Sequence, residues 1–179
     1  MSDTASDASG AAQGGIDPAR FQMFLDEIRA EQNLPLALLT GSIAAAIGAG
    51  LWTAITVATN YQIGFMAVGV GLLVGVAVRK FGKGIDKPFG IAGAGLSLLG
   101  CAVGNLLTAC QIFANHEEVP LMKVVSSLTP NVAKEIMVAT FSPMDLLFYG
   151  IAVYEGYRLS FGRLTRDDLD AALSQQSGT

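Results

Sequence analysis

The sequence predicts an all-α integral membrane protein built as a bundle of four transmembrane helices. Of its 179 residues, 51% are apolar and only 15% are charged, whereas about 25% of residues are charged in soluble domains. The mean hydropathy of the chain is +0.48. The apolar residues gather in long blocks, which predict spans at about 36–58, 63–81, 89–113 and 143–160. This composition excludes a nucleic-acid-binding domain, a disulfide-stapled secreted module and an ordinary cytosolic enzyme.

The first three blocks differ in how they match the thickness of a bilayer. Block 36–58 has no charged residue and reaches the ~20 residues that a transmembrane helix needs. The link at 59–62 is so short that block 63–81 must return as the antiparallel half of a hairpin. That block either runs on through Phe81 or lies in locally thinned bilayer. Block 89–113 follows the basic loop between Arg79 and Lys87.

The fourth block is preceded by the longest loop, 114–142. Block 143–160 carries Asp145, Glu155 and Arg158 near its two ends. Within the loop, Thr129 and Pro130 are typical of a helix start. We expect short interfacial helices there, one or two in number, which either lie at the membrane surface or cap the bundle.

The two ends of the chain are polar. Residues 1–16 are small and low in complexity, which predicts a disordered tail. Asp17 and Pro18 supply an N-cap and a first-turn proline for an amphipathic juxtamembrane helix within 17–33. Its polar face is mainly acidic, so docking on protein and lying on lipid headgroups both stay open. The membrane domain covers 34–161, and the tail 162–179 holds a short helix that begins near Thr165.

The distribution of basic residues predicts the orientation. With the N-terminus inside, nine of the 11 lysines and arginines are cytoplasmic, and only Lys123 and Lys134 are outside. The positive-inside rule favours this arrangement. No signal-peptide pattern precedes the first block, so we expect that block to be retained as the insertion signal. The prediction is a multi-pass inner-membrane (plasma-membrane) protein with both termini cytoplasmic.

Small residues at a spacing of four mark the faces where helices approach one another. In lipid, helices associate through close van der Waals contact, so such faces indicate helix packing. Whether a given face packs inside the chain or against a partner or second copy stays open. The residues that we assign to this helix-packing or partner seam are Ser42, Ala46 and Gly50 of the first span, Gly71 and Gly75 of the second, and Gly100 and Gly104 of the third.

Asn105 is a polar residue that lies deep inside the predicted span 89–113. It lies on the small-residue face of block 89–113, where it either links two helices by a hydrogen bond or forms part of a binding site or pathway. The charged residues of block 143–160 lie near the membrane rims instead. A proton-coupled pump needs acidic residues near the midplane, so this distribution argues against one.

Other candidate sites give weaker signals. Cys101 and Cys110 are nine residues apart, which is about 13 Å along a helix and too far for a disulfide. His116 beside Glu117 and Glu118 is a weak indication of metal, and a solvated loop explains it as well. Glycine-rich patterns inside the spans follow no strand, so they are not dinucleotide fingerprints. We therefore expect no cofactor, no metal and no catalytic residue.

Two stretches of the chain carry a familiar pattern. Residues 31–71 contain the turn Tyr61-Gln62-Ile63-Gly64 between the first two spans, and residues 144–157 form most of the last span. Both stretches resemble a widespread group of small, uncharacterised polytopic proteins of the bacterial inner membrane. The resemblance implies that location, and it implies no activity, cofactor or site residue.

These observations favour a non-enzymatic role as a scaffold, assembly factor or accessory subunit of a membrane complex. The expected partners are the lipid bilayer and a membrane protein or a second copy, with no nucleic acid. The alternative is a small oligomeric transporter or channel. A polar cavity around Ser42, Ser97, Asn105 and Thr108 would favour that alternative. An intramembrane enzyme would need a nucleophile and a base at matching depth, and the sequence shows no such pair.

Overall fold

The structure, a computed structural model, describes residues 18–59, 61 and 64–162. The predicted tail 1–16 and the helix near Thr165 lie outside these residues. The described part is helical and contains no strand. Its helices are α1 (Pro18–Ala30), α2 (Leu34–Thr59), α3 (Phe65–Gly82), α4 (Lys87–His116), α5 (Leu121–Ser126), α6 (Pro130–Thr140) and α7 (Pro143–Leu159).

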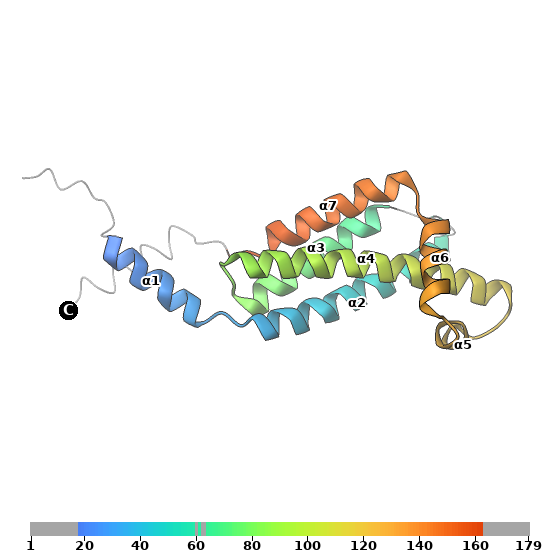
Figure 1. Cartoon of the computed structure of the whole chain (residues 1–179), viewed down its shortest axis with the longest axis horizontal. Helices are drawn as coiled ribbons and strands as arrows, with labels where there is room; N and C mark the ends of the chain where they lie inside the picture. The colour runs from blue at the N-terminus through green and yellow to red at the C-terminus, as the bar shows by residue number, and fades with distance from the viewer. Residues whose placement is uncertain (1–17, 60, 62–63, 163–179) are drawn as a thin grey trace, which may run out of the picture.

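The long helices α2, α3, α4 and α7 lie side by side (Figure 1). α3 and α4 contact each other, and each of them also packs against both α2 and α7. α1 extends beyond one end of this bundle, and α6 crosses the other end with α5 beside it. We call these two ends the α1 end and the α6 end.

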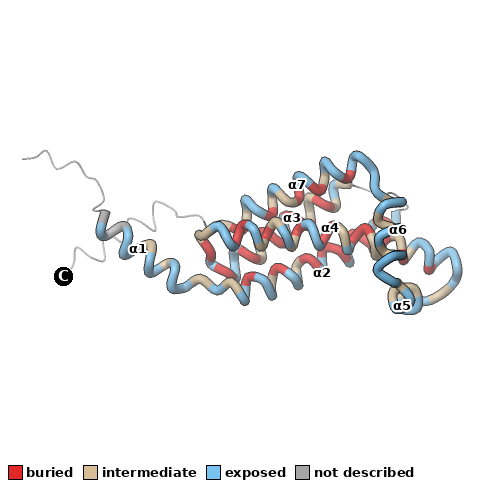
Figure 2. The backbone as a smooth tube through the Cα atoms, viewed as in Figure 1, coloured by how far each residue is buried: buried red, intermediate tan, exposed pale blue. Residues whose placement is uncertain are grey.

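Three of the helices are long and apolar enough to cross a membrane: α2, α3 and α4. α7 has 17 residues and joins this set only if α6 and α7, which are bent by 105° at the break between them, form one span. The described residues therefore contain three or four candidate spans. Figure 2 shows that buried residues face the interior of the bundle while exposed residues cover its outside.

The helices run past the predicted spans at several ends. α4 begins before residue 89 and continues past residue 113 to His116. Asp86 stands at its N-cap and Pro88 in its first turn, and a proline is well tolerated there because its missing N–H would have no partner. The prediction marked where apolar residues stop, whereas a helix ends where its backbone hydrogen bonds stop. α3 begins at Phe65, two residues after the predicted start.

The first turns of α6 and α7 are both capped by side chains. The Thr129 side chain accepts a hydrogen bond from the N–H of Val132, so α6 begins at Pro130 as the sequence predicts. At the start of α7, Ser142 and Asp145 form a capping box, in which the N–H of Ser142 donates to the Asp145 carboxylate at 2.8 Å. Two reciprocal caps of this kind satisfy backbone N–H groups that have no partner inside the helix. Asp145 therefore has a structural role.

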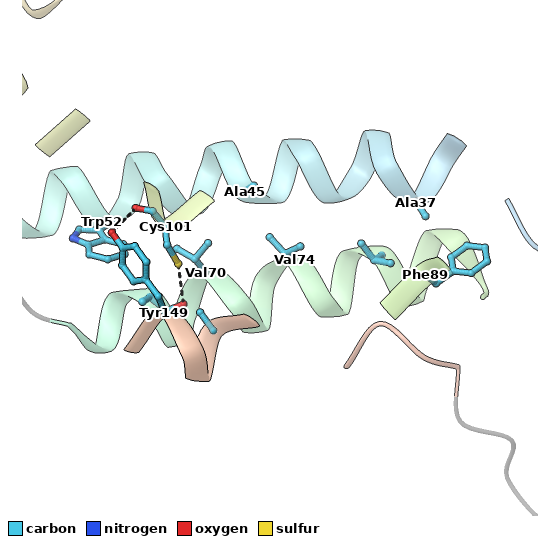
Figure 3. Close-up of a cluster of buried hydrophobic side chains, with 11 residues drawn as sticks. Ala37, Ala45, Trp52, Val70, Val74, Phe89, Cys101 and Tyr149 are labelled. Atoms are coloured by element: carbon cyan, nitrogen blue, oxygen red, sulfur yellow. Dashed lines mark hydrogen bonds between the residues drawn. The ribbon is translucent and has the colours of Figure 1, made fainter. Parts of the chain in front are cut away.

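The middle of the bundle is filled by apolar side chains (Figure 3). Trp52 is 1% exposed and makes an edge-on contact with Tyr149, with ring centroids 6.4 Å apart. The hydroxyl of Tyr149 donates to the carbonyl oxygen of Cys101 at 3.3 Å, so its polar end is satisfied. Toward the α1 end, Val74 and Val78 are fully buried. Cys101 and Cys110 are both free thiols, and both are buried.

Charged side chains and one backbone hydrogen bond, from the N–H of Asn33 to the carbonyl oxygen of Gly82 at 3.0 Å, join α1 and the link after it to the end of α3 and the α3–α4 loop. Lys83 pairs with Glu31 at 2.9 Å, and the guanidinium of Arg29 lies 3.5 Å from the carboxylate of Asp86. The exposed fraction of these four side chains runs from 41% for Asp86 to 64% for Glu31. Exposed pairs contribute little to stability, because water competes for both charges.

α3 and α7 approach each other at two glycines of the predicted seam. A Cβ atom on Gly71 would lie 2.5 Å from the carbonyl oxygen of Ala152, and one on Gly75 would lie 2.7 Å from the Cβ of Leu159. Both distances are too short for real atoms. The first clash is with backbone, which cannot rotate away, so α7 fits here only because residue 71 has no side chain.

Gly71→Val should therefore destabilise the bundle, by about 1–3 kcal/mol for an overpacked contact. Gly69→Val is the matched control, because a Cβ at Gly69 meets no atom within 4 Å. Thermal unfolding in a mild detergent, followed by circular dichroism, measures both. Equal melting temperatures for the two variants would contradict this account of the α3–α7 contact.

Candidate functional site

A cavity of about 550 Å³ lies at the α6 end, between α2, α4 and α6. We call it the α6-end cavity. Its size is within the range of small-molecule sites. Its lining residues are Thr56, Val57, Asn105, Thr108, Ala109, Ile112, Asn115, His116 and Thr140.

Two of its polar residues join helices. Asn105, which is 2% exposed, donates from Nδ2 to the Oγ1 of Thr140 at 3.3 Å and so links α4 to α6. Thr108 donates to the carbonyl oxygen of Gly104 at 2.7 Å, and its hydroxyl lies 3.3 Å from that of Thr53 on α2. Asn105 therefore links two helices and also lines the α6-end cavity.

The hydroxyl of Thr56 is buried without a hydrogen-bond partner. The residue is 3% exposed and lines the α6-end cavity. A buried polar group in this state costs about 1–3 kcal/mol. One turn earlier, the indole N–H of Trp52 is also buried and unpaired. In Figure 3 its nitrogen lies on the side of the ring away from Val70 and Val74.

The lining of the cavity contains no lysine, arginine, aspartate or glutamate. Its titratable member is His116, which is exposed and stands beside the exposed Glu117 and Glu118. Among the residues that the structure describes, no group of three or more histidine, cysteine or acidic side chains is placed to hold a metal ion. The walls thus offer hydroxyl and amide groups, together with apolar surface.

The cavity includes only two of the four polar residues whose grouping around one cavity would favour transport. Asn105 and Thr108 line it, but Ser97 is fully buried elsewhere, where its hydroxyl donates to the carbonyl oxygen of Gly93 at 2.7 Å. Ser42 is exposed on the outside of α2. One turn toward the α1 end, Trp52 fills the space between α2 and α7. The cavity is therefore confined to one end of the bundle and does not continue through it.

The seam residues of α2 face outward. Ser42, Ala46 and Gly50 are exposed, and the same row continues with the exposed Ala54 and Ala58. We call these five residues the α2 outer stripe. A Cβ on Gly50 would meet no atom within 4 Å. A second hollow, of about 440 Å³, lies beside the α6-end half of the stripe and is lined by Gly50, Thr53, Ala54, Val57, Ala58, Leu107, Gln111 and Leu121.

The seam glycines of α4 face inward. A Cβ on Gly100 would lie 2.7 Å from a methyl carbon of Val70, and one on Gly104 would lie 3.2 Å from the Trp52 ring. With Gly71 and Gly75, they let the helices of this chain pack closely. The predicted seam therefore divides into four glycines that pack internally and three α2 residues that are left uncovered.

Two features of the site were not singled out by the sequence pattern. One is the inward face of α2, which contains Gly41, Ala45 and Ala49 and so shows the same small-residue spacing as the outer stripe. The other is Thr56, which lies four residues after Trp52 and therefore on the same helix face. Placing the single tryptophan on the inward face would have identified both.

The link between α4 and α6 can be measured by a double-mutant cycle on Asn105 and Thr140. We expect Asn105→Ala and Thr140→Val to show a coupling free energy of about 0.5–1.5 kcal/mol, because they share one hydrogen bond. The control cycle pairs Thr140→Val with Gln111→Ala, since Gln111 bonds to Asn115 instead. Unfolding free energies in detergent give both values. A coupling no larger than that of the control would mean that this bond does not hold α6 in place.

Comparison with known proteins does not assign the chain to a family. No protein-family model matches the chain, and neither a curated protein nor a solved structure does. The cavity and the α2 outer stripe are therefore the features of the molecule that bear on its function.

Proposed function

We propose that the chain is a non-enzymatic, four-span membrane protein that serves as a scaffold, assembly factor or accessory subunit of a membrane complex. The observation that carries this proposal is the α2 outer stripe, a row of small residues that no other part of the described structure covers. The resemblance noted above implies the bacterial inner membrane as the location.

The outer surface of the bundle supports a lipid environment. Large apolar side chains are widely exposed on α2, including Leu39 at 59%, Ile43 at 52% and Ile47 at 55%. Contiguous apolar surface of this extent is rare on soluble monomers. In this proposal α7 is the fourth span even without α6: its 17 residues would cover about 26 Å at 1.5 Å per residue, which a locally thinned bilayer can accommodate.

The basic residues support an orientation with both termini inside. Arg79, Lys80, Lys83 and Lys87 all lie near the α1 end, at the loop between α3 and α4. Lys123 and Lys134 belong to α5 and α6. With the α1 end in the cytoplasm, the side richer in lysine and arginine is the inner side, as the positive-inside rule requires.

The α2 outer stripe is suited to a transmembrane helix of another protein. It extends from Ser42 to Ala58, about 24 Å of helix, so it runs through most of a hydrocarbon layer. Because its side chains are small, a partner helix can approach the backbone closely, which is the main source of helix association in lipid. Exposed Ile43, Ile47 and Leu51 lie beside the stripe and would flank that helix.

The transporter or channel alternative has weaker support. The α6-end cavity includes Asn105 and Thr108, but it excludes Ser97 and Ser42, and Trp52 and Val70 are buried in the bundle on its α1 side. A pathway through one copy would therefore require the core to open. Transport would instead need an assembly of several copies.

Gly50→Ile should remove the partner without unfolding the protein. A Cβ at Gly50 has open space around it, but the larger side chain would keep a partner helix away from the stripe. Gly95→Ile is the matched control, since Gly95 is exposed on α4 and also has no atom within 4 Å of its Cβ. For an overpacked interface costing about 1–3 kcal/mol, the partner recovered should fall at least about fivefold.

The measurement is purification in a lipid-preserving detergent followed by native mass spectrometry. A stoichiometric partner that is retained by Gly95→Ile and lost with Gly50→Ile supports the proposal. Retention of the partner by Gly50→Ile would show that the stripe is not the docking face. A pure homo-oligomer without another protein would overturn the accessory role and favour transport.

The orientation can be tested with single introduced cysteines, because both natural cysteines are buried. Ser126→Cys on α5 and Lys83→Cys at the α1 end both replace exposed residues. A membrane-impermeant maleimide applied to spheroplasts should label Ser126→Cys, and it should label Lys83→Cys only after the membrane is opened. The reverse pattern would invert the orientation.

A further inference from the structure

We propose that the apolar face of α1 is the docking surface for the segment of this chain that follows Gly162, residues 163–179. This inference goes beyond the accessory role, and it does not depend on the α2 outer stripe. It rests on where the chain leaves the described structure, on the side chains of α1 and on the sequence pattern after Gly162.

α1 and the outgoing chain meet at the same loop. The N–H of Gly162 donates to the carbonyl oxygen of Gly84 at 2.8 Å, so the described structure ends against the α3–α4 loop. The neighbouring residue of that loop, Lys83, pairs with Glu31 at 2.9 Å, directly after the last turn of α1. The chain that follows Gly162 therefore starts near the C-terminal end of α1.

α1 has an apolar face that no other described helix covers. Phe24, Leu25 and Ile28 lie on one side of the helix and are half-buried, whereas Met23 on the opposite side is 65% exposed. Within the described residues, no other helix packs extensively against α1. A row of large apolar side chains on one helix face is typical of a surface that packs against another element.

The segment after Gly162 has a matching pattern. On the helix predicted to begin near Thr165, Leu169, Ala172 and Leu173 share one face. A helix this short is marginal in water by itself, so its apolar face needs a surface on which to pack. Only two residues separate Gly162 from Thr165, so the nearest apolar surface outside the bundle is that of α1.

The lengths of the two elements agree. The two helices run antiparallel in this arrangement, because α1 ends at the bundle and the segment starts there. From Thr165 to Leu173 the predicted helix covers about 13 Å, and the apolar row from Phe24 to Ile28 covers about 6 Å. The segment is therefore long enough to cover the whole row, with Leu169 nearest to Leu25 and Ile28.

Lipid fits this face less well. α1 extends past the end of the bundle (Figure 1), so in the proposed four-span arrangement it points away from the surface that lipid covers. Its exposed polar residues include Asp26 and Glu27, which the negative surface of a membrane repels. A segment of the same chain needs no such contact, and it is held next to α1 by its covalent link to α7.

Disulfide trapping tests the contact in the full chain, since both natural cysteines are buried. The protein carries Leu25→Cys and Leu169→Cys, is placed in nanodiscs and is oxidised with copper–phenanthroline. A disulfide within one chain should form, because the two positions face each other. The matched control combines Met23→Cys with Leu169→Cys. Met23 lies on the opposite side of α1, so its pair should oxidise more slowly and to a lower yield.

Hydrogen exchange measures whether the contact stabilises α1. Leu169→Asp with Leu173→Asp removes the apolar face of the segment and leaves the bundle unchanged. Amide exchange in α1, followed by mass spectrometry, should then be at least about tenfold faster, since exposing even one buried leucine changes an equilibrium by about that factor. Gln175→Asp with Gln176→Asp adds the same charge outside the predicted helix, and it should leave the exchange of α1 as it is in the parent protein.

Three results would overturn the proposal. The first is an equal yield of disulfide from the two cysteine pairs. The second is a disulfide that joins two chains instead of closing one, which would assign the face of α1 to a second copy. The third is unchanged exchange of α1 in the Leu169→Asp, Leu173→Asp variant, which would leave the face to another protein.

Discussion

Close approach of helix backbones is the constraint on which the rest of the structure depends. Many leucines and isoleucines of the bundle lie on its outside, and inside it small residues let the helices approach closely around a few larger side chains such as Trp52 and Val74. Gly71 against Ala152 is one such contact, and Gly104 against the Trp52 ring is another. In a lipid environment, where apolar burial adds little between helices, packing of this kind is the main source of cohesion.

This packing also determines where polar side chains can lie inside the bundle. Toward the α1 end, buried apolar side chains such as Val74 and Val78 fill the interior, and Ser97 satisfies its hydroxyl on its own helix. At the α6 end, α6 crosses the bundle instead of continuing it, and the space between α2 and α4 stays open. Polar side chains therefore gather there, and the α6-end cavity is a consequence of how the bundle ends.

The sequence predicted the helical class and the approximate helix positions well, because long apolar blocks separated by charged or proline-containing loops determine both. It did not predict which face of α2 turns inward. Two small-residue rows run along that helix, one containing Ala45 and the other Ala46, and spacing alone cannot distinguish them. In the structure the ring of Trp52 marks the inward face, where it packs against Gly104 of α4 and Tyr149 of α7. The sequence did not predict the α6-end cavity either, because the cavity depends on the 105° bend between α6 and α7.

The attachment of α1 has a consequence for how the molecule responds to its surroundings. The pairs Lys83–Glu31 and Arg29–Asp86 that hold this helix near the α3–α4 loop are exposed to solvent. The range of such attractions shrinks to about 8 Å at physiological ionic strength and to about 3 Å in molar salt. Added salt should therefore weaken these pairs, so that α1 is held less firmly relative to the bundle. The packing within the bundle should be unchanged.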